Sequence, residues 1–125
     1  MSRTPISTTA APSPAGAYSQ AVVANGFVYT AGFGGHDPVT GQLGETIEEQ
    51  TRAVLSSISA VLAEAGLDLG DVVKATVHLH DLDRDFAGFN AEYAAHFSPP
   101  YPVRTTVGSR LAGILVEIDV VAAQR

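Results

Sequence analysis

The dipeptide Asn25-Gly26 constrains the fold of this chain more than any other feature, because it lies between two short runs of strand-forming residues. Both residues tolerate positive φ angles, so Asn-Gly favours a two-residue turn between adjacent antiparallel strands. The runs on either side, residues 21–24 and 27–32, read Ala-Val-Val-Ala and Phe-Val-Tyr-Thr-Ala-Gly. A β-hairpin is therefore predicted, and an antiparallel sheet is part of the expected fold.

Two segments have the periodicity of amphipathic helices. Thr46 and Glu49 have the spacing of a capping box, in which two side chains satisfy each other's free backbone amides, and Gly66 supplies a stop. Between them, apolar residues recur every three or four positions, at Val54, Leu55, Ile58, Val61, Leu62 and Ala65. A second helix is predicted over residues 83–97, with a buried aromatic stripe and a Pro-Pro end, at Phe86, Phe89, Tyr93, Phe97 and Pro99-Pro100.

Three further segments have the pattern of strands. Residues 72–80 alternate between a predicted buried face, Val73, Ala75, Val77 and Leu79, and a polar face, Lys74, Thr76, His78 and His80. Residues 102–109 and 114–123 are rich in Val, Ile and Thr and are predicted to form a closing hairpin. With a short edge strand in residues 1–17, this order of elements predicts an α+β fold with both helices on one face of the sheet.

Length and charge narrow the classes of function. A chain of 125 residues has the usual length of one domain, so residues 1–125 are predicted to form a single domain. The net charge of −6 disfavours sequence-independent binding of nucleic acid. Only 16% of the residues are charged, where about 25% is typical of soluble domains. Because the cores of protein interfaces are depleted of charge, part of the surface is predicted to be hidden in an oligomer.

The lack of cysteine and of long apolar segments excludes further classes of site and location. The chain has no cysteine, which excludes disulfides, thiolate nucleophiles and thiolate metal sites. Its first residues lack the apolar segment of a signal peptide, and no run is long enough to span a bilayer. We therefore expect a cytoplasmic protein without membrane attachment.

Arg104 and Glu117 are the strongest candidates for chemistry. Alternation places Arg104 on one strand face with Thr106, and Glu117 on one face with Asp119. If their two strands pair as an antiparallel hairpin, Arg104 lies roughly opposite Glu117. One interpretation is a cross-strand ion pair. The other is a pocket in which the guanidinium grips a small carboxylate through two parallel hydrogen bonds while the Glu117 carboxylate handles a water.

Histidines and one asparagine are weaker candidates. His78 and His80 could ligate a metal, yet no third ligand is spaced to join them, which favours a solvated or interfacial pair. His36 lies in a glycine-rich turn, where a role in the turn competes with a place at the rim of a cleft. Asn90 lies on the aromatic face of its helix, and a buried amide needs hydrogen-bond partners, which favours a structural or cleft role.

Five short motifs follow one another along the chain: Gly16-Ala17-Tyr18-Ser19-Gln20, Tyr29-Thr30-Ala31-Gly32, Phe89-Asn90, Pro102-Val103-Arg104-Thr105 and Val116-Glu117-Ile118. Their order and spacing resemble those of the RidA/YjgF family of reactive-intermediate deaminases, also called the endoribonuclease L-PSP family. The resemblance extends over nearly the whole chain, and its most specific part is Pro-x-Arg followed by a hydrophobic-Glu-Ile strand. It implies a mixed, mostly antiparallel sheet with two helices on one face, like the small chorismate-mutase type.

The resemblance also implies an activity. It implies a homotrimer with clefts between neighbouring subunits, which hydrolyses 2-imino acids or their enamine tautomers to 2-oxo acids and ammonia, with no metal or organic cofactor. Arg104 would bind the substrate carboxylate, and Glu117 would orient or deprotonate the attacking water. The cleft would be lined by Tyr18, Gly32, Asn90 and Thr106. An imine carbon is already electrophilic, so positioning, a water and a route for protons are the main requirements.

A few positions depart from the pattern common in the family. Ala17 replaces a frequent proline, Ala31 a serine, Phe33 a glutamine, and Thr106 a cysteine. These changes keep the carboxylate anchor and are expected to alter substrate size and rate. Two other functions stay open: a trimer that binds small carboxylates or protein partners without turnover, and a ribonuclease or translation inhibitor. The acidic charge and the lack of a basic stripe disfavour the second of these.

Overall fold

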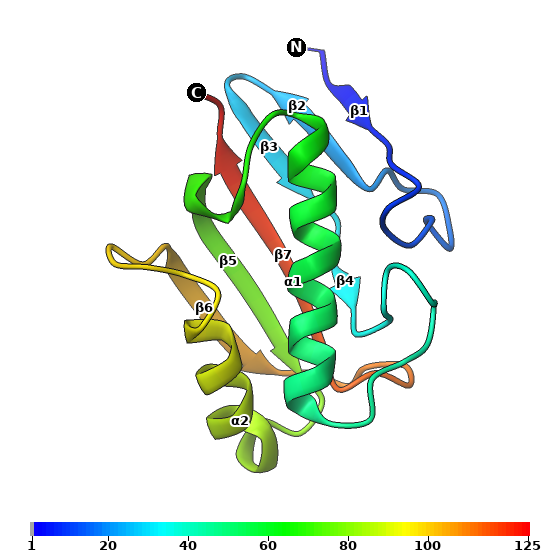
Figure 1. Ribbon diagram of the computed structural model, residues 1–125, viewed down its shortest axis with the longest axis vertical. Coiled ribbons are helices and arrows are strands. Elements are labelled where there is room, and N and C mark those ends of the chain that lie inside the picture. Colours follow the sequence, from blue (N-terminus) through cyan, green and yellow to red (C-terminus); the bar gives the residue numbers. More distant parts are fainter. Residues whose placement is uncertain (1) are drawn as a thin grey trace.

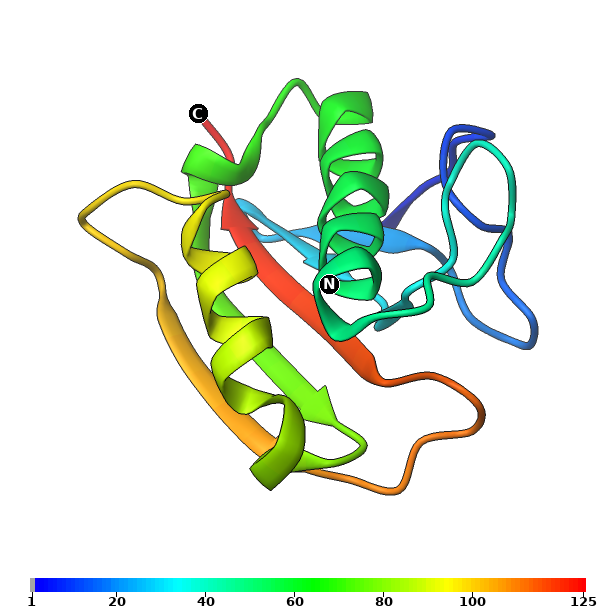
Figure 2. The ribbon, with the colours of Figure 1, turned by 60° about the horizontal axis from the view of Figure 1, so that its bottom comes forward.

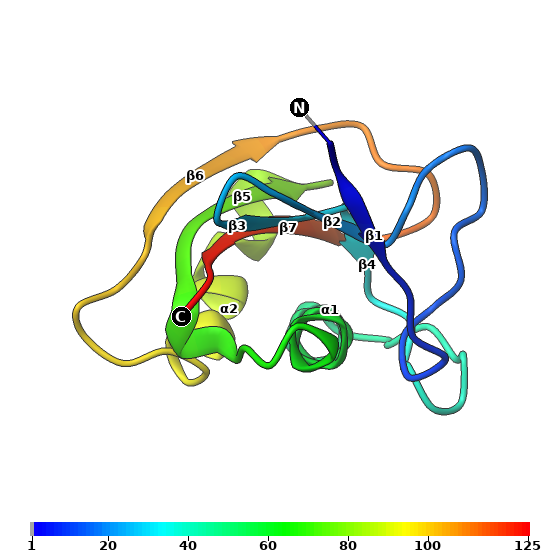
Figure 3. The ribbon, with the colours of Figure 1, turned by 90° about the horizontal axis from the view of Figure 1, so that it is seen from above.

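A computed structural model describes residues 2–125 and contains one mixed sheet with two helices on the same face (Figure 3). The strands are β1 (Thr4–Ile6), β2 (Ala21–Ala24), β3 (Phe27–Thr30), β4 (Phe33–Gly34), β5 (Val72–Leu79), β6 (Val103–Gly108) and β7 (Val116–Ala123). The helices are α1 (Ile47–Glu64) and α2 (Leu82–Ala94), with a 3₁₀ turn at Leu69–Asp71. The predicted fold class is confirmed. Neither helix is long and apolar enough to cross a bilayer.

The strand order across the sheet is β1-β2-β3-β7-β5-β6, and β4 also pairs with β7 (Figure 1). The Asn25-Gly26 turn joins β2 to β3 as predicted, with positive φ angles of 56° and 86°. The edge strand β1 pairs with β2. The N-terminal hairpin and its edge strand are therefore confirmed.

Helix α1 begins and ends where the sequence predicts. The hydroxyl of Thr46 accepts a hydrogen bond from the Glu49 amide at 3.1 Å. The Glu49 carboxylate accepts from the amide of Glu45, at 3.0 Å, and not from Thr46, so only half of the predicted capping box forms. Gly66 follows the helix with a φ of 72°. The buried stripe is confirmed at Val54, Leu55, Ile58, Val61 and Leu62, while Ala65 is half-buried.

Helix α2 is shorter than predicted, since it ends at Ala94 and not at residue 97. In its aromatic stripe Phe89 and Tyr93 are buried and Phe97 is half-buried. The prediction that Phe86 is buried was wrong, because this ring is 40% exposed. Phe86 faces Arg104 of β6. Because β6 is the edge strand of the sheet, this end of the aromatic stripe lies at the border of the core.

Strand β5 contains an irregularity that the alternation does not predict. Val72 pairs with Ala122 and Lys74 with Val121, so Val73 is left out of the ladder as in a β-bulge. Val73 is consequently exposed, against the prediction, and Val72 takes the buried place. Beyond the bulge Ala75, Val77 and Leu79 are buried as predicted.

The predicted closing hairpin was wrong, because β6 and β7 do not pair with each other. Strand β5 lies between them, parallel to β6 and antiparallel to β7. The chain passes from β5 through α2 to β6, and a helical crossover of this kind is how two adjacent strands come to run parallel (Figure 2). Residues 109–115 then cross the end of β5, where the Ser109 amide donates to the carbonyl of Leu79 and the Leu115 carbonyl accepts from the amide of His80, just beyond the strand.

This pairing places Arg104 and Glu117 on opposite faces of the sheet. Residues paired across a ladder point the same way. Arg104 pairs with Ala75, which is buried beneath the helices, whereas Glu117 pairs with His78 and Gly34 on the face without helices. We call the face without helices the open face. The prediction that Arg104 lies opposite Glu117 was therefore wrong, and the two side chains do not share a site within one chain.

Candidate functional site

Arg104 lies in a cavity of about 440 Å³, which we call the Arg104 cavity. Its walls come from α2 and from the segment that enters β6, and they are Asn90, Tyr93, Ala94, Tyr101, Pro102 and Arg104. The central carbon of the guanidinium is 4.7 Å from the ring centre of Tyr93, 5.2 Å from that of Phe89 and 5.9 Å from that of Phe86. The cation therefore rests against aromatic rings and not against a carboxylate.

The pairing of cations in residues 2–125 makes Arg104 exceptional. Arg52, Arg84 and Arg125 each form ion pairs with carboxylates. Four cations form none, namely Arg3, Lys74, Arg104 and Arg110, and of these Arg104 alone is half-buried. Partly removing a guanidinium from water without an anion costs free energy unless aromatic faces or a ligand compensate. The Arg104 cavity is thus suited to an anionic ligand.

Glu117 lies in a second cavity, of about 380 Å³, which we call the Glu117 cavity. It shares no lining residue with the first and is lined by Pro12, Ser13, Ala15, Tyr18, Gln20, Gly32, Phe33, Gly34, His36, Ala112, Ile114 and Glu117. A Cβ atom added to Gly32 would lie 2.8 Å from the carboxyl carbon of Glu117. Only glycine therefore leaves room for the carboxylate in this position.

Tyr18 reaches the Glu117 cavity from the loop between β1 and β2. Its hydroxyl accepts a hydrogen bond from the Ala15 amide at 3.0 Å. The loop is held by the buried side chain of Gln20, which accepts from the Thr8 amide at 2.7 Å and donates to the Pro12 carbonyl at 2.8 Å. Gln20 thereby fixes the backbone that carries Tyr18.

The other predicted site residues divide between the two cavities. Asn90 lines the Arg104 cavity, and Gly32 and Tyr18 line the Glu117 cavity. His36 also lines the Glu117 cavity, which favours its interpretation as a rim residue. Thr106 lines neither, and its hydroxyl is buried with no hydrogen-bond partner in residues 2–125.

The two histidines of residues 72–80 contact the chain that crosses the end of β5. Nδ1 of His78 is 2.6 Å from the Ser109 hydroxyl, and Nδ1 of His80 accepts from the Leu111 amide at 3.1 Å. In residues 2–125 no group of three or more histidine, aspartate or glutamate side chains is arranged to hold a metal ion.

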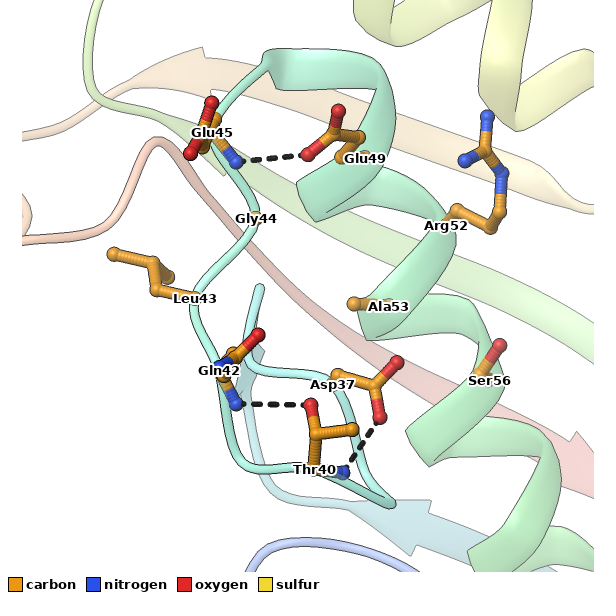
Figure 4. Close-up of a pocket in the computed structure, with 10 residues that line it drawn as sticks. All are labelled: Asp37, Thr40, Gln42, Leu43, Gly44, Glu45, Glu49, Arg52, Ala53 and Ser56. Atoms are coloured by element: carbon orange, nitrogen blue, oxygen red, sulfur yellow. Dashed lines mark hydrogen bonds between the residues drawn. The ribbon is translucent and has the colours of Figure 1, made fainter.

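A cavity of about 620 Å³, larger than either of these two, lies between α1 and the loop before it (Figure 4). Two of its charged side chains, those of Asp37 and Arg52, already have partners within the chain. The Asp37 carboxylate accepts from the amides of Val39 and Thr40 at 2.8 Å, and the bond from Thr40 is the main reason that the pKa of Asp37 is below its ordinary value. Arg52 pairs with a carboxylate of α2. We therefore place the candidate site at the two smaller cavities.

The chain matches a known protein family over most of its length. A family model described as endoribonuclease L-PSP matches residues 8–124. The chain belongs to the RidA/YjgF family. The resemblance predicted from the sequence motifs is confirmed.

Named members of the RidA/YjgF family are similar over most of their length. A 2-iminobutanoate/2-iminopropanoate deaminase of Capra hircus is 42% identical over 123 residues, covering 95% of this chain and 88% of the relative. The crystal structure of RidA from the Antarctic bacterium Psychrobacter sp. PAMC 21119 is 40% identical, with a TM-score of 0.90 and coverage of 97% and 99%. The structure of E. coli TdcF with bound serine is 32% identical, with a TM-score of 0.88 and coverage of 97% and 98%.

Some contributors to the site of this RidA/YjgF chain were not predicted as such. Phe89 and Tyr93 were expected only as core residues, although both lie against Arg104. Their spacing along α2 signals a shared helix face, but it carries no information on which strand residue lies over that face. Gln20 and Tyr101 also line the cavities. Gln20 belongs to the first of the five motifs but was given no role, and no sequence signal marked Tyr101.

Proposed function

We propose that this protein hydrolyses 2-imino acids, or their enamine tautomers, to 2-oxo acids and ammonia. The observation that carries the proposal is the half-buried Arg104 guanidinium with no anion partner in residues 2–125. A planar guanidinium binds a carboxylate through two parallel hydrogen bonds, and these substrates carry a carboxylate next to the imine carbon. The deaminase name of the goat relative and the amino acid bound in the TdcF structure also support this substrate class.

We propose further that the cleft forms between copies of the chain, in a homotrimer. Arg104 and Glu117 lie on opposite faces of the sheet, so one chain alone does not present both to one substrate. The Arg104 cavity of one copy would meet the Glu117 cavity of the next. Apolar side chains exposed on the open face support such an assembly, namely Phe27, Tyr29, Val103 and Val107.

In this mechanism Arg104 holds the carboxylate and places the imine carbon before Glu117 of the neighbouring copy. The Glu117 carboxylate orients a water and accepts its proton as the oxygen bonds to the imine carbon, while the C=N electron pair moves to nitrogen. The nitrogen takes up protons, the C–N bond breaks, and the carbonyl forms as the hydroxyl loses its proton. One imine and one water give one 2-oxo acid and one ammonia. Tyr18, Asn90 and the backbone at Gly32 would line the cleft.

The test is to generate the imine with an amino-acid oxidase or a threonine dehydratase and to follow its loss. The wild-type protein is expected to accelerate the loss, and Arg104→Ala to give only the rate without protein. Arg104→Lys is also expected to lose most of the activity, because an ammonium keeps the charge and lacks the planar fork. Arg110→Ala, which removes an exposed unpaired arginine, is the matched control and should keep the wild-type rate. A wild-type rate in Arg104→Ala would overturn the proposal.

Binding of small carboxylates without turnover is the second candidate, because the Arg104 cavity alone supplies the anion site. Calorimetric binding of a 2-oxo acid, together with no acceleration of imine loss, would favour it. Cleavage of RNA is not proposed, since the net charge is −6 and three of the seven basic residues are held in ion pairs. The cytoplasmic location stays a prediction.

A further inference from the structure

We propose that three rings of α2, those of Phe86, Phe89 and Tyr93, form an aromatic platform that positions Arg104 for the substrate carboxylate. The inference rests on the proposed function, in which Arg104 binds that carboxylate. The three are positioning residues, because they act through Arg104. They would determine how tightly a carboxylate binds and not how fast the imine reacts.

The aromatic platform is a continuous surface fixed by contacts between its own rings. Residues 86, 89 and 93 are three and four positions apart, so they share one side of α2. The ring centres of Phe86 and Phe89 are 6.4 Å apart and those of Phe89 and Tyr93 are 5.5 Å apart, both pairs tilted. Tyr93 also stacks on Phe97 at 4.5 Å. Phe89 and Tyr93 are buried, which restricts the motion of the two rings nearest to Arg104.

Contact with aromatic faces has a consequence that contact with a carboxylate would not have. A ring attracts a cation through the negative charge of its face and accepts no strong hydrogen bond. A delocalised, weakly hydrated guanidinium is well suited to such a surface. Its N–H groups then stay free for a ligand, whereas an aspartate or glutamate in the same place would compete for them. The aromatic platform therefore holds the arginine without occupying its donors.

Tyr93 is the central member, since its ring centre is nearest to the guanidinium, at 4.7 Å. Its hydroxyl is buried and has no hydrogen-bond partner in residues 2–125. Burial raises the pKa of Tyr93, while the nearby charge of Arg104 acts in the opposite direction. A neutral phenol is thus expected at neutral pH, so Tyr93 supplies no anion to Arg104.

A matched pair of substitutions at position 93 separates this role from simple core packing. Tyr93→Phe keeps the ring and removes the hydroxyl, and Tyr93→Leu keeps an apolar side chain and removes the ring. We expect Tyr93→Phe to have a KM for the imino acid close to that of wild type. Tyr93→Leu is expected to raise KM by about threefold to tenfold with kcat nearly unchanged, as for the loss of an interaction made equally in the ground and transition states. Equal KM values for the two variants would overturn the proposal.

A second readout needs no substrate. The side-chain Nε–H signal of Arg104, observed by NMR in the free protein, is expected to be shifted by the neighbouring rings. The shift should persist in Tyr93→Phe and largely disappear in Tyr93→Leu. An unchanged signal in a folded Tyr93→Leu would overturn the aromatic platform. If the signal behaves as expected and the wild-type protein binds no 2-oxo acid, the proposed function fails and with it the role in substrate binding, but the contact with Arg104 stands.

Two further variants guard against a failure to fold and test the coupling. Phe86→Leu removes a partly exposed ring that is farther from the Arg104 guanidinium than Tyr93 is. The variant should therefore fold, and its KM should rise by less than that of Tyr93→Leu. In an Arg104→Ala background, Tyr93→Leu should lower the free energy of unfolding by less than it does in the wild-type background, because the ring has no guanidinium to contact. The same loss of stability in both backgrounds would show that Tyr93 acts independently of Arg104 and would contradict the proposal.

Discussion

Two charged residues at the candidate site, Arg104 and Glu117, form no ion pair within residues 2–125. A different neighbour accommodates each of them. Arg104 rests on aromatic rings, which leave its donors free. Glu117 occupies space that opens because Gly32 has no side chain. Charged groups that are partly buried are usually paired or hydrogen-bonded. Each of these two is therefore available to a ligand or to another copy of the chain.

The space above Gly32 leads to a prediction for Gly32→Ala. The added Cβ would lie 2.8 Å from the carboxyl carbon of Glu117, so the carboxylate has to move. Imine hydrolysis is expected to fall on the order of tenfold or more, because a misplaced catalytic group loses its productive geometry. The coupled imine assay measures this loss, with circular dichroism as the check on folding.

Gly108→Ala is the control for that variant. A Cβ at Gly108 meets its neighbours at 3.4 Å or more, which is ordinary contact. It should therefore keep nearly all of the activity. Full activity in Gly32→Ala would mean that the position of the Glu117 carboxylate does not matter to the reaction.

Among the elements, local signals located most helices and strands and the β2–β3 hairpin, but they did not identify how β5, β6 and β7 pair. Asn25-Gly26 forms a turn and Thr46 caps a helix through contacts with residues next to them in the sequence. The sequence alone therefore predicts both features. The residues of β6 and β7 are equally suited to pair with each other or with β5. The insertion of β5 between them follows from packing of the whole sheet, as does the bulge that exposes Val73.

For the candidate site, the sequence likewise identified single residues but not how they are arranged. Arg104 and Glu117 stand out because their charge interrupts apolar strands, and a strand pattern gives the face of each residue relative to its neighbours. The prediction that Arg104 lies opposite Glu117 depended on a hairpin of β6 and β7, which does not form. The rings beneath Arg104 belong to another element, and contacts between elements are set by tertiary packing.

Glu92 joins the two helices and leads to a prediction of pH-dependent stability. Its carboxylate lies 2.8 Å from Nε2 of His96 and 2.9 Å from Nη2 of Arg52 on α1. The hydrogen bond with His96 is the main reason that the pKa of Glu92 is below its ordinary value of 4.5. A lowered carboxyl pKa stabilises the folded state above the unfolded value, and this contribution is lost as the pH falls below it.

Glu92→Gln should therefore lower the free energy of unfolding at about pH 6 and have a smaller effect at about pH 3. Urea unfolding at both pH values measures the difference. Glu64→Gln removes an exposed carboxylate with no ion pair in residues 2–125 and should give no such difference. The same loss of stability at both pH values for Glu92→Gln would contradict the role assigned to the carboxylate.

For the whole molecule, the proposed assembly would explain both the low content of charged residues and the exposed apolar side chains of the open face. Only 16% of residues are charged, and apolar side chains of β3 and β6 are exposed where no helix covers the sheet. Burying such a surface against further copies stabilises an oligomer. The proposed trimer would also bring together the two cavities that one chain keeps apart.

Val107→Asp places a charge on the open face and is expected to prevent assembly. Wild-type protein should sediment at three times the 13.0 kDa mass of the chain, and the variant at one chain mass. The variant should keep its circular dichroism and lose its activity, because each cleft needs two copies. Val39→Asp changes a valine that is 92% exposed in the loop before α1, and it should remain trimeric and active. A monomeric Val107→Asp with full activity would contradict the proposed assembly.

The central claim is that Arg104 of one copy and Glu117 of another serve the same cleft. Its most direct test is to unfold Arg104→Ala and Glu117→Ala, mix them in equal amounts and refold them together, with each variant refolded alone as a control. Random assembly gives each cleft an intact Arg104 and an intact Glu117 in about a quarter of cases, so about a quarter of the activity of refolded wild type is expected. Each variant alone should be inactive. A mixture as inactive as the separate variants would contradict the claim, since that result is expected if both residues had to come from one chain.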